Sequence, residues 1–194
     1  SEPVIFFNDI KRTDKQMGVF GEVSYALSDT SELSVGARWY DIEVDFEGSA
    51  NSSFYNGFGA PDTQQFGSNL SAQYAPGNAN GYPDTAKTDG VIGKVTYSWN
   101  PSDDVMYYVT WSEGFRPGLL NRPVGASNAA GTYSVKPEVK SDEVTNTEFG
   151  WKTILKDGQL RFNGSVFMVD VEGLQSTIFD PSIVNLFFSD NAAD

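Results

Sequence analysis

Neither cysteine nor histidine occurs among the 194 residues of the sequence. The absence of cysteine excludes disulfides, thiolate metal sites and cysteine nucleophiles. The absence of histidine excludes a Ser-His-Asp triad, an imidazole base and the ordinary zinc and haem sites, so we expect no cofactor and no metal site. Carboxylate chemistry is the remaining common enzymatic option, and Glu113 with Asp142 is its candidate pair.

Basic residues are also scarce. Lys and Arg number 13 against 26 Asp and Glu, the formal net charge is −13, and the basic residues form no cluster. A nucleic-acid partner is therefore not expected. There is no apolar run of about 18 residues, the length that a transmembrane helix needs, and Ser1 does not open a signal peptide. The chain is either soluble or meets a membrane through strands.

Alternation with a period of two is the strongest pattern in the chain. We expect seven antiparallel strands and an all-β fold, with strands at residues 17–27, 32–46, 90–99, 105–115, 143–155, 159–175 and 182–189. No segment with a helical period stands out between them.

The connections between these strands alternate in length. Residues 28–31, 100–104 and 156–159 are tight turns, and Asp157-Gly158 in the last one is a strong hairpin signal. Residues 47–88 and 116–141 are long loops. Short turns at one end and long loops at the other are typical of an outer-membrane barrel, in which the turns are periplasmic and the loops extracellular.

Residues opposite each other in an antiparallel pair share a face, so matching the faces predicts the register. We expect Val95 opposite Val109 in the second hairpin. Three tryptophans would each cover a bare glycine on the neighbouring strand, a known stabilising arrangement. The expected pairs are Trp39 with Gly21, Trp111 with Gly93, and Trp151 with Gly164. Only the last pair follows independently, because the Asp157-Gly158 turn sets its register.

The two faces of the predicted sheet differ in polarity. One face is apolar and aromatic, and lipid would cover its rings, which include Trp39, Tyr107, Trp111 and Trp151. The other face would line a water-filled lumen with Glu22, Arg38, Lys94, Glu148 and Lys152, and Glu22 is expected opposite Arg38. The core of a soluble sandwich is the alternative interpretation of the apolar face.

Three segments resemble TonB-dependent outer-membrane receptors. "FGEVSYALSDTSELSVGARW" (20–39) resembles a hairpin of that family, and "YYVTWSEGFRPG" (107–118) resembles its aromatic strand ending in G-F-R/K-P-G. "VKPEVKSDEVTNTEFGWKTILKDGQLRFNGSVFMVDVEGLQ" (135–175) is similar to its P-E-x-x-x-x-x-E-x-G-x-K hairpin and the strand that follows.

The resemblance implies a 22-stranded barrel with an N-terminal plug in the outer membrane of a Gram-negative bacterium. Such receptors take up scarce nutrients, and the TonB complex of the inner membrane supplies the energy. This chain has about seven expected strands and no segment resembling the plug or its TonB-binding box. We therefore expect residues 1–194 to be a partial barrel, an open part of the wall of a receptor for a ferric siderophore or other iron complex, and not an enzyme.

The long loops supply the candidate ligand contacts. Loop 116–141 carries Arg116, Arg122, Lys136 and Lys140 against the single acid Glu138, and arginine suits anionic chelates. Loop 47–88 supplies the aromatic candidates Tyr55, Tyr74 and Tyr82. The structural alternatives are that loop 116–141 is simply solvated and that loop 47–88 packs on itself.

Four carboxylates at a spacing of two follow Trp39, namely Asp41, Glu43, Asp45 and Glu47. They could hold Ca²⁺, but a solvated rim above the lipid accounts for them more simply.

Two other classes of function stay open. One is a small complete barrel with a structural or adhesive role, in which residues 1–10 supply an eighth strand. The other is a soluble β-sandwich that binds carbohydrate or uses paired carboxylates as an enzyme.

Overall fold

The computed structural model describes residues 6–52, 85–121, 125–183 and 187–192, with side chains described for 11–45 of the first range. The strands are β1 (Phe6–Ser28), β2 (Ser31–Ser52), β3 (Thr85–Ser102), β4 (Val105–Arg116), β5 (Leu119–Leu120), β6 (Glu138–Val139), β7 (Asp142–Leu155), β8 (Leu160–Glu172), β9 (Gln175–Ile178) and β10 (Phe188–Asn191). The described residues contain no helix, and hence no helix long and apolar enough to cross a membrane.

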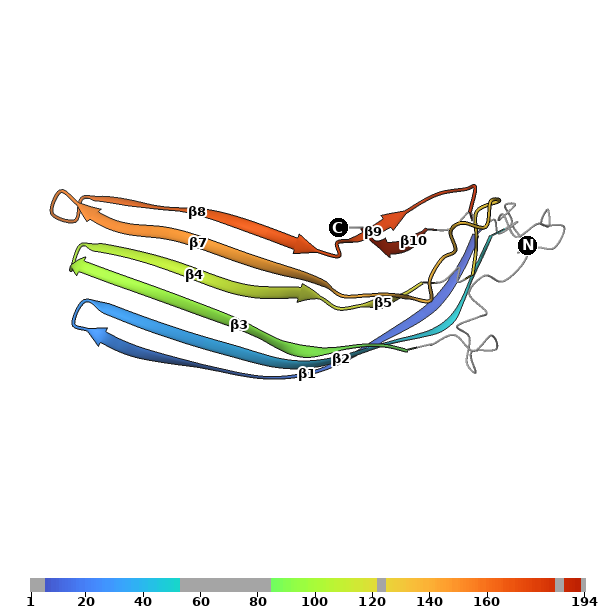
Figure 1. Cartoon of the computed structure of the whole chain (residues 1–194), viewed down its shortest axis with the longest axis horizontal. Helices are drawn as coiled ribbons and strands as arrows, with labels where there is room; N and C mark the ends of the chain where they lie inside the picture. Colours follow the sequence, from blue (N-terminus) through green and yellow to red (C-terminus); the bar gives the residue numbers. More distant parts are fainter. Residues whose placement is uncertain (1–5, 53–84, 122–124, 184–186, 193–194) are drawn as a thin grey trace.

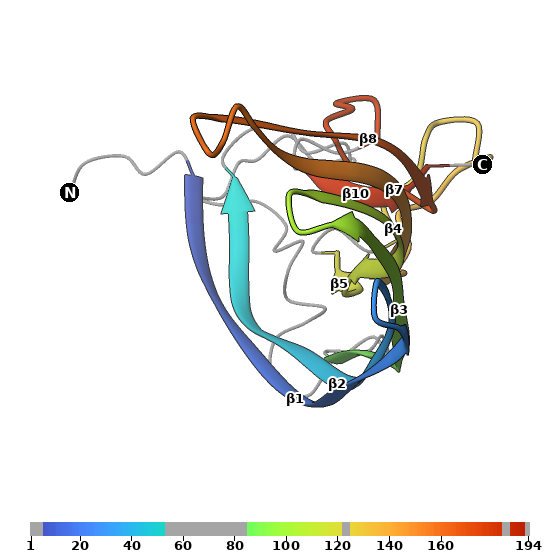
Figure 2. The ribbon, with the colours of Figure 1, turned by 90° about the vertical axis from the view of Figure 1, so that its left-hand side faces the viewer.

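One antiparallel sheet dominates the molecule. Its six strands follow the order β1-β2-β3-β4-β7-β8, and β9-β10 and β5-β6 form two small two-stranded sheets. The long strands run side by side along the long axis, with three tight turns at one end and the small sheets at the other (Figure 1). Seen from the turn end, the sheet is a curved, open wall (Figure 2). The expected all-β fold of antiparallel hairpins is confirmed.

The strand boundaries differ from the expected ones at both ends of the chain. β1 already begins at Phe6, so residues 6–10 extend the first strand instead of forming an eighth. Of the expected strand 182–189, the described residues 182–183 and 187–189 do not join the large sheet, which has six strands in the described part of the chain rather than seven. Gly173 has a positive φ of 62° and ends β8, so the chain leaves the wall there and forms the β9-β10 hairpin.

The register of the β7-β8 hairpin is confirmed, with Trp151 opposite Gly164. The other two expected registers are wrong by one residue pair. Trp39 lies opposite Val19 instead of Gly21, and Trp111 lies opposite Val95 instead of Gly93.

The same displacement removes two further expected pairs. Glu22 lies opposite Gly36, not Arg38, and Val109 lies opposite Tyr97, not Val95. Irregularities just before the turns, at Ala26/Ser28 and at Trp99/Ser102, cause the error because alternation in the sequence does not reveal a bulge. The displacement is two residues along each strand, so every side chain keeps its expected face.

The large sheet has an apolar face that continues across all six strands. Aligned pairs link Val23 to Val35, Val35 to Val95, and Val95 to Trp111. None of the described residues covers this face, since Trp39 is 38% exposed and Val166 is 62% exposed. Other exposed members are Val19, Tyr25, Val91, Tyr97, Trp99, Val109, Phe149, Phe162 and Met168.

On five strands this apolar face ends at a charged residue. The next position on the same face, two residues beyond the last apolar side chain, is charged in each case: Lys15, Asp41, Asp89, Glu113 and Asp170. On β3 the apolar stretch runs from Val91 to Trp99, roughly 26 Å of strand. Tilted by about 40°, a strand of that length spans roughly 20 Å of height, a little less than the apolar band of about 25 Å in a transmembrane barrel.

The opposite, polar face carries hydrogen-bonded rows. The hydroxyls of Thr96 and Thr110 lie 2.9 Å apart, and the Tyr108 hydroxyl donates to Glu148 at 2.6 Å. Glu22 lies 3.7 Å from Lys94, two strands away, and this contact takes the place of the expected one with Arg38. Lys152 lies over the Tyr108 ring, 6.0 Å from its centroid. The expected polar face is therefore present.

Glycines make room for rings of neighbouring strands. A Cβ at Gly164 would meet the Trp151 ring on the apolar face, and a Cβ at Gly150 would meet the Tyr108 ring on the polar face. At Gly21, by contrast, a Cβ would find no atom within 4 Å. Only glycine lets Trp151 and Tyr108 lie flat against the sheet.

We expect Gly164→Ala to destabilise the protein by about 1–3 kcal/mol, because the added methyl displaces the Trp151 ring. Gly21→Ala is the matched control and should leave stability unchanged. The measurement is the free energy of unfolding in urea. Equal effects of the two alanines would contradict the packing of Trp151 on Gly164, and the difference should vanish in a Trp151→Ala background.

Candidate functional site

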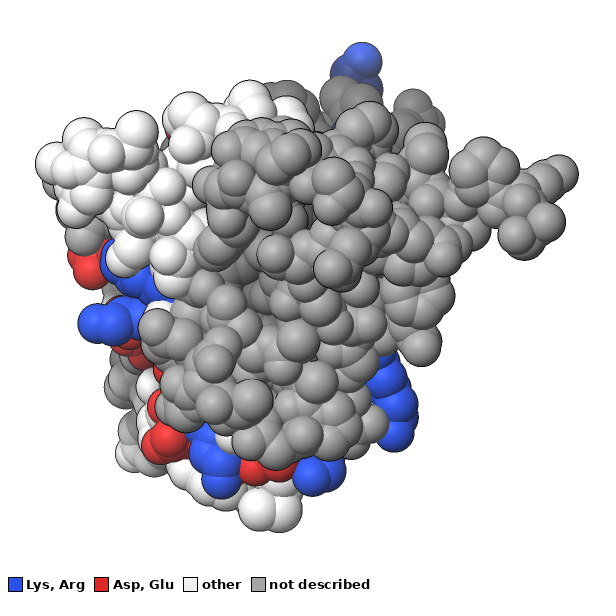
Figure 3. Space-filling model, turned by 90° about the vertical axis from the view of Figure 1, so that its right-hand side faces the viewer, with Lys and Arg blue, Asp and Glu red and all other residues white. Residues whose placement is uncertain are grey.

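The end of the wall opposite the tight turns carries a small packed unit, which we call the rim unit: residues 117–121, 125–141 and 173–192, as far as they are described. Its core consists of Ala126, Val135, Ile183 and Phe188, with Tyr133 and Ile178 packed against it. It joins the connection between β4 and β7 to the segment that follows β8. In the view from this end, charges of both signs lie next to one another along the edge of the described part (Figure 3).

Asp142 fastens the rim unit to the wall. It is the first residue of β7, lies opposite the last residue of β4 and is 1% exposed. The Arg116 backbone N–H donates to its carboxylate at 3.0 Å and the Arg116 Nε at 2.7 Å, and a second guanidinium nitrogen also contacts it. The N–H of Gln175 donates to the same carboxylate at 3.4 Å. The ligand candidate Arg116 therefore joins β4, β7 and β9.

Buried amide side chains hold the two segments of the rim unit together. Asn121 is 3% exposed, donates to the carbonyls of Lys136 and Ser189, and accepts from the Ser189 N–H at 2.7 Å. Gln175 donates to the carbonyls of Pro117 and Lys140. These amides did not emerge from the sequence, because nothing in the pattern distinguishes a buried asparagine from one in a solvated loop.

Lys136, a second ligand candidate, pairs with an acid in the rim unit. Its Nζ lies 3.1 Å from Asp190, and the Tyr133 hydroxyl donates to the same carboxylate at 2.9 Å. Burial alone would raise the pKa of Asp190, but the hydrogen bonds from Lys136 and Tyr133 outweigh it and lower that pKa. Burial, and then the hydrogen bond to Asp190, raise the pKa of Tyr133 to about 12.

The remaining candidates divide into two groups. Arg122, Tyr55, Tyr74 and Tyr82 lie outside the described residues. Lys140 belongs to the rim unit through its backbone, whose N–H donates to Asn191 at 3.0 Å. The structure thus places Arg116 where the wall joins the rim unit and Lys136 within the rim unit, each paired with an acid of this chain.

Glu113 and Asp142, the candidate carboxylate pair, have separate partners. The ladder between β3 and β4 ends at Lys94 and Ser112. Just beyond it, the Glu113 carboxylate accepts the free N–H of Gly93 at 2.7 Å. Here Tyr40 stacks on Phe115, with ring centroids 3.8 Å apart. Glu113 therefore replaces a missing ladder bond, while Asp142 holds Arg116.

The carboxylates that follow Trp39 are partly neutralised. Glu43 lies 3.0 Å from Lys15 and 3.1 Å from Lys87, the residues opposite it on both neighbouring strands. Among the described residues, no group of three or more Asp or Glu could hold a metal ion. The Glu47 side chain lies outside the described part.

A sequence model of the family described as "TonB dependent receptor-like, beta-barrel" matches residues 3–194. The chain belongs to this family. The resemblance seen in its three segments is thereby confirmed. No curated protein sequence matches this receptor chain at a significant level.

Three solved structures of similar fold are receptors or transporters by title. The ferric yersiniabactin uptake receptor FyuA from Yersinia pestis is 14% identical with a TM-score of 0.59, over 86% of this chain and 21% of that one. The alcaligin outer-membrane receptor FauA from Bordetella pertussis is 16% identical with a TM-score of 0.50, over 87% of this chain and 22% of that one. The copper transporter OprC is 16% identical with a TM-score of 0.59, over 93% of this chain and 25% of that one. The receptor chain spans about a fifth to a quarter of these proteins.

The Lys136–Asp190–Tyr133 cluster makes the rim unit sensitive to extremes of pH. The pKa of Asp190 is lower in the folded protein than in the unfolded chain. The stability that ionised Asp190 contributes to the rim unit is therefore present above the unfolded value of 3.8 and is lost as the pH falls through the folded value. The stability that neutral Tyr133 contributes to the rim unit is fully present below its unfolded pKa of 10.0 and is lost as the pH rises through its folded pKa of about 12.

We expect pepsin to leave the peptide bonds near Phe187 intact in the full-length receptor at about pH 4 and to cut them at about pH 2. Asp190→Asn should be cut at both values, because the amide cannot form the ion pair with Lys136. Mass spectrometry of the fragments is the measurement. The same pH profile in Asp190→Asn and the unchanged receptor would exclude this role for Asp190.

Proposed function

We propose that this chain is one part of the wall of an outer-membrane receptor that imports a scarce nutrient in a Gram-negative bacterium. The observation that carries the proposal is the uncovered apolar face that continues over six strands and ends at a charged residue on five of them. Exposing this face to water would cost a large free energy, whereas lipid would cover it. Membership of the TonB-dependent receptor family supports the same assignment.

The two faces of the wall have different roles in this proposal. The apolar face meets lipid, with Trp39 and Trp111 next to the charged residues that end it and Trp99, Tyr107 and Trp151 towards the turns. The polar face, with its Glu22–Lys94 and Tyr108–Glu148 contacts, lines the lumen. The turns are periplasmic, and the rim unit is extracellular, where ligand first arrives. A second sheet, which a soluble sandwich needs, does not cover the apolar face in the described part of the chain.

The ligand that we propose is a metal chelate, and in particular a ferric siderophore or another iron complex. Two of the similar structures are receptors for ferric yersiniabactin and alcaligin, although the third is a copper transporter. Arg116 and Lys136 stand at the rim with more than half of their side chains exposed, 53% and 63%. Their acid partners hold them in place, and their exposed cations add a positive element to an acidic chain.

Energy would come from the TonB complex, acting through a plug domain of the full-length receptor. The chain itself would carry out no chemistry, since its candidate carboxylates Glu113 and Asp142 serve structural contacts. Its proposed role is to form part of the barrel wall and to position the rim unit on the extracellular side.

Metal uptake by cells tests this assignment. Cells whose only importer is the full-length receptor should accumulate iron from ferric chelates, and accumulation should stop when the TonB complex or the proton motive force is removed. Elemental mass spectrometry of washed cells is the measurement. Accumulation of copper without iron would contradict the proposed ligand, and uptake that is indifferent to TonB would contradict the proposed mechanism.

A further inference from the structure

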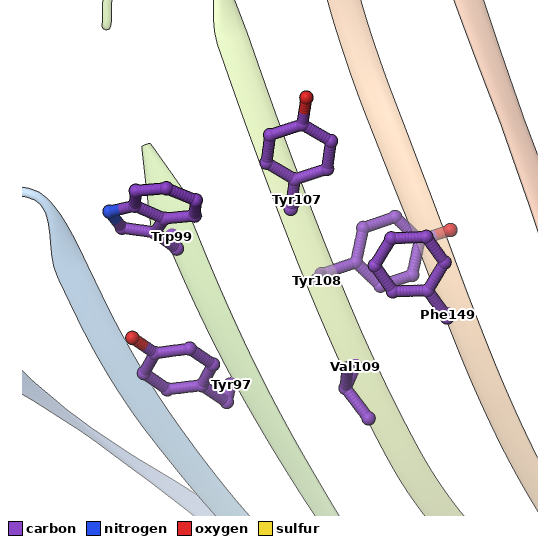
Figure 4. Close-up of a pocket in the computed structure, with 6 residues that line it drawn as sticks. All are labelled: Tyr97, Trp99, Tyr107, Tyr108, Val109 and Phe149. Atoms are coloured by element: carbon purple, nitrogen blue, oxygen red, sulfur yellow. The ribbon is translucent and has the colours of Figure 1, made fainter. Parts of the chain in front are cut away.

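Exposed rings on the apolar face of the wall have a cover in the proposed function, because lipid meets them. Tyr97, Trp99, Tyr107 and Phe149 surround Val109 there and border a recess of about 340 Å³, which hydrocarbon chains would fill (Figure 4). The polar face also carries exposed apolar side chains, and these point away from lipid. That face therefore needs a different cover for its own apolar side chains.

Three exposed apolar side chains of the polar face lie on one strand, β8. Phe167 is opposite Glu148 of β7, and Val169 and Val171 follow it on the same face. We call these three residues the β8 stripe. Phe167 is 69% exposed, and the two valines are nearly half exposed. A further strand beyond β8 would pair with its edge and leave this face bare. Contact of the β8 stripe with water is unfavourable, so we expect a protein surface to cover it.

Two basic residues lie at the turn end of the same surface. Lys152 of β7 and Arg161 of β8 are diagonal neighbours on the polar face and border a recess of about 420 Å³. Asp103 and Asp104 of the β3-β4 turn border it as well, but none of these four side chains forms an ion pair with a described residue. Two neighbouring cations on one face repel each other. A carboxylate beside them would relieve this repulsion, so the β7-β8 side of the recess suits an acid.

The polar face of β1 to β4 has a different character. The hydroxyls of Ser24 and Ser34 lie 2.6 Å apart, and those of Thr96 and Thr110 lie 2.9 Å apart. Hydroxyl rows of this kind suit water, and apart from the exposed ring of Phe20 they offer little apolar surface to a protein partner. The polar face is thus divided, with hydroxyls on β1 to β4 and with cations and the β8 stripe on β7 and β8.

We propose that the polar side of β7 and β8 is a docking surface for another segment of the same receptor, in which an acidic side chain lies beside apolar ones. The acid lies against Lys152 and Arg161, and the apolar side chains cover the β8 stripe. Arg161 and Phe167 are six residues apart, roughly 20 Å of strand, so an extended segment of about six residues spans the surface. The ligand then passes along the hydroxyl rows of β1 to β4.

The rest of the receptor can supply this segment on the inner side of the wall. The chain spans 21% of FyuA and 25% of OprC, so most of a receptor of that size lies outside residues 1–194. β5 lies on the inner side of the curved wall (Figure 2), and the Gly118 N–H just before it donates to the Thr88 hydroxyl on the polar face at 2.9 Å. The polar face is therefore the inner one. This inference rests on the proposed function, which makes that inner side the lumen of a receptor.

Photo-crosslinking in the full-length receptor, embedded in lipid vesicles, tests the docking surface. Benzoylphenylalanine in place of Phe167 should form cross-links to a peptide of the same receptor outside residues 1–194, identified by mass spectrometry. The same label in place of Met168, which points to lipid, is the matched control and should form none. In place of Thr96, on the hydroxyl side, it should also form none. No protein cross-link from position 167, or equal cross-linking from positions 167 and 96, would overturn the proposal.

A carbodiimide, which joins an amine to a neighbouring carboxylate, tests the acid. Lys94 lies 3.7 Å from Glu22, so coupling of these two is the internal control in every sample. Lys152 should be coupled to an Asp or Glu outside residues 1–194, and Lys152→Arg should lose this product while it keeps the charge. Coupling of Lys152 to Asp103 or Asp104 instead, or no Lys152 product in a sample that contains the Lys94–Glu22 product, would contradict the acidic partner.

Failure of the docking surface and failure of the proposed function give different results. The absence of cross-links from position 167 leaves the membrane assignment intact. Recovery of the full-length receptor in the soluble fraction of cells without detergent would overturn the proposed function itself.

Discussion

The structure depends on one constraint, the antiparallel pairing of six strands that places one continuous apolar surface on one side of the sheet. Pairing fixes which residues lie opposite, and alternation assigns each of them to a face. A slip of one residue on any strand would turn its apolar residues to the polar side, so the continuous surface from Val19 to Val166 requires all five pairings at once. Five of the strands also change from apolar to charged residues on that face. Lipid outside and water inside is the environment in which these features are consistent.

The same pairing builds the rim unit. The β4-β7 ladder continues to its last pair, Arg116 with Asp142, and thereby places a guanidinium beside a buried carboxylate where both strands end. Gln175 reaches that carboxylate from β9, so the segment after β8 is fastened to the end of the β4-β7 ladder. The β3-β4 ladder ends earlier, and Glu113 supplies an acceptor to Gly93 in place of the missing strand bond. Backbone groups that lose their ladder partner are thus satisfied by side chains at the rim, which a wall next to lipid requires.

Much of the wall was predictable from the sequence, and much of the rim was not. The faces followed from alternation alone, and the register of β7-β8 followed from Asp157-Gly158, because that turn defines which residues pair. The other two registers were displaced because bulges near Leu27 and Asn100 leave no trace in the pattern. At the rim, Arg116 and Lys136 stood out as charges, but their partners Asp142 and Asp190 are 26 and 54 residues away in the chain. Long-range pairs of this kind arise from the fold and cannot be read from local spacing.

The most direct test of the central claim is the environment of successive residues on β3. The sequence contains no cysteine, so nitroxide labels can be attached to single cysteines placed in turn at positions 91 to 99 of the full-length receptor in lipid vesicles. Electron paramagnetic resonance then measures collisions with oxygen, which concentrates in lipid, and with a water-soluble nickel complex. High oxygen and low nickel accessibility at Val91, Val95, Tyr97 and Trp99, with the reverse at Lys94, Thr96 and Ser98, is the result expected for a wall between lipid and water. Nickel accessibility that does not alternate along the strand would contradict it.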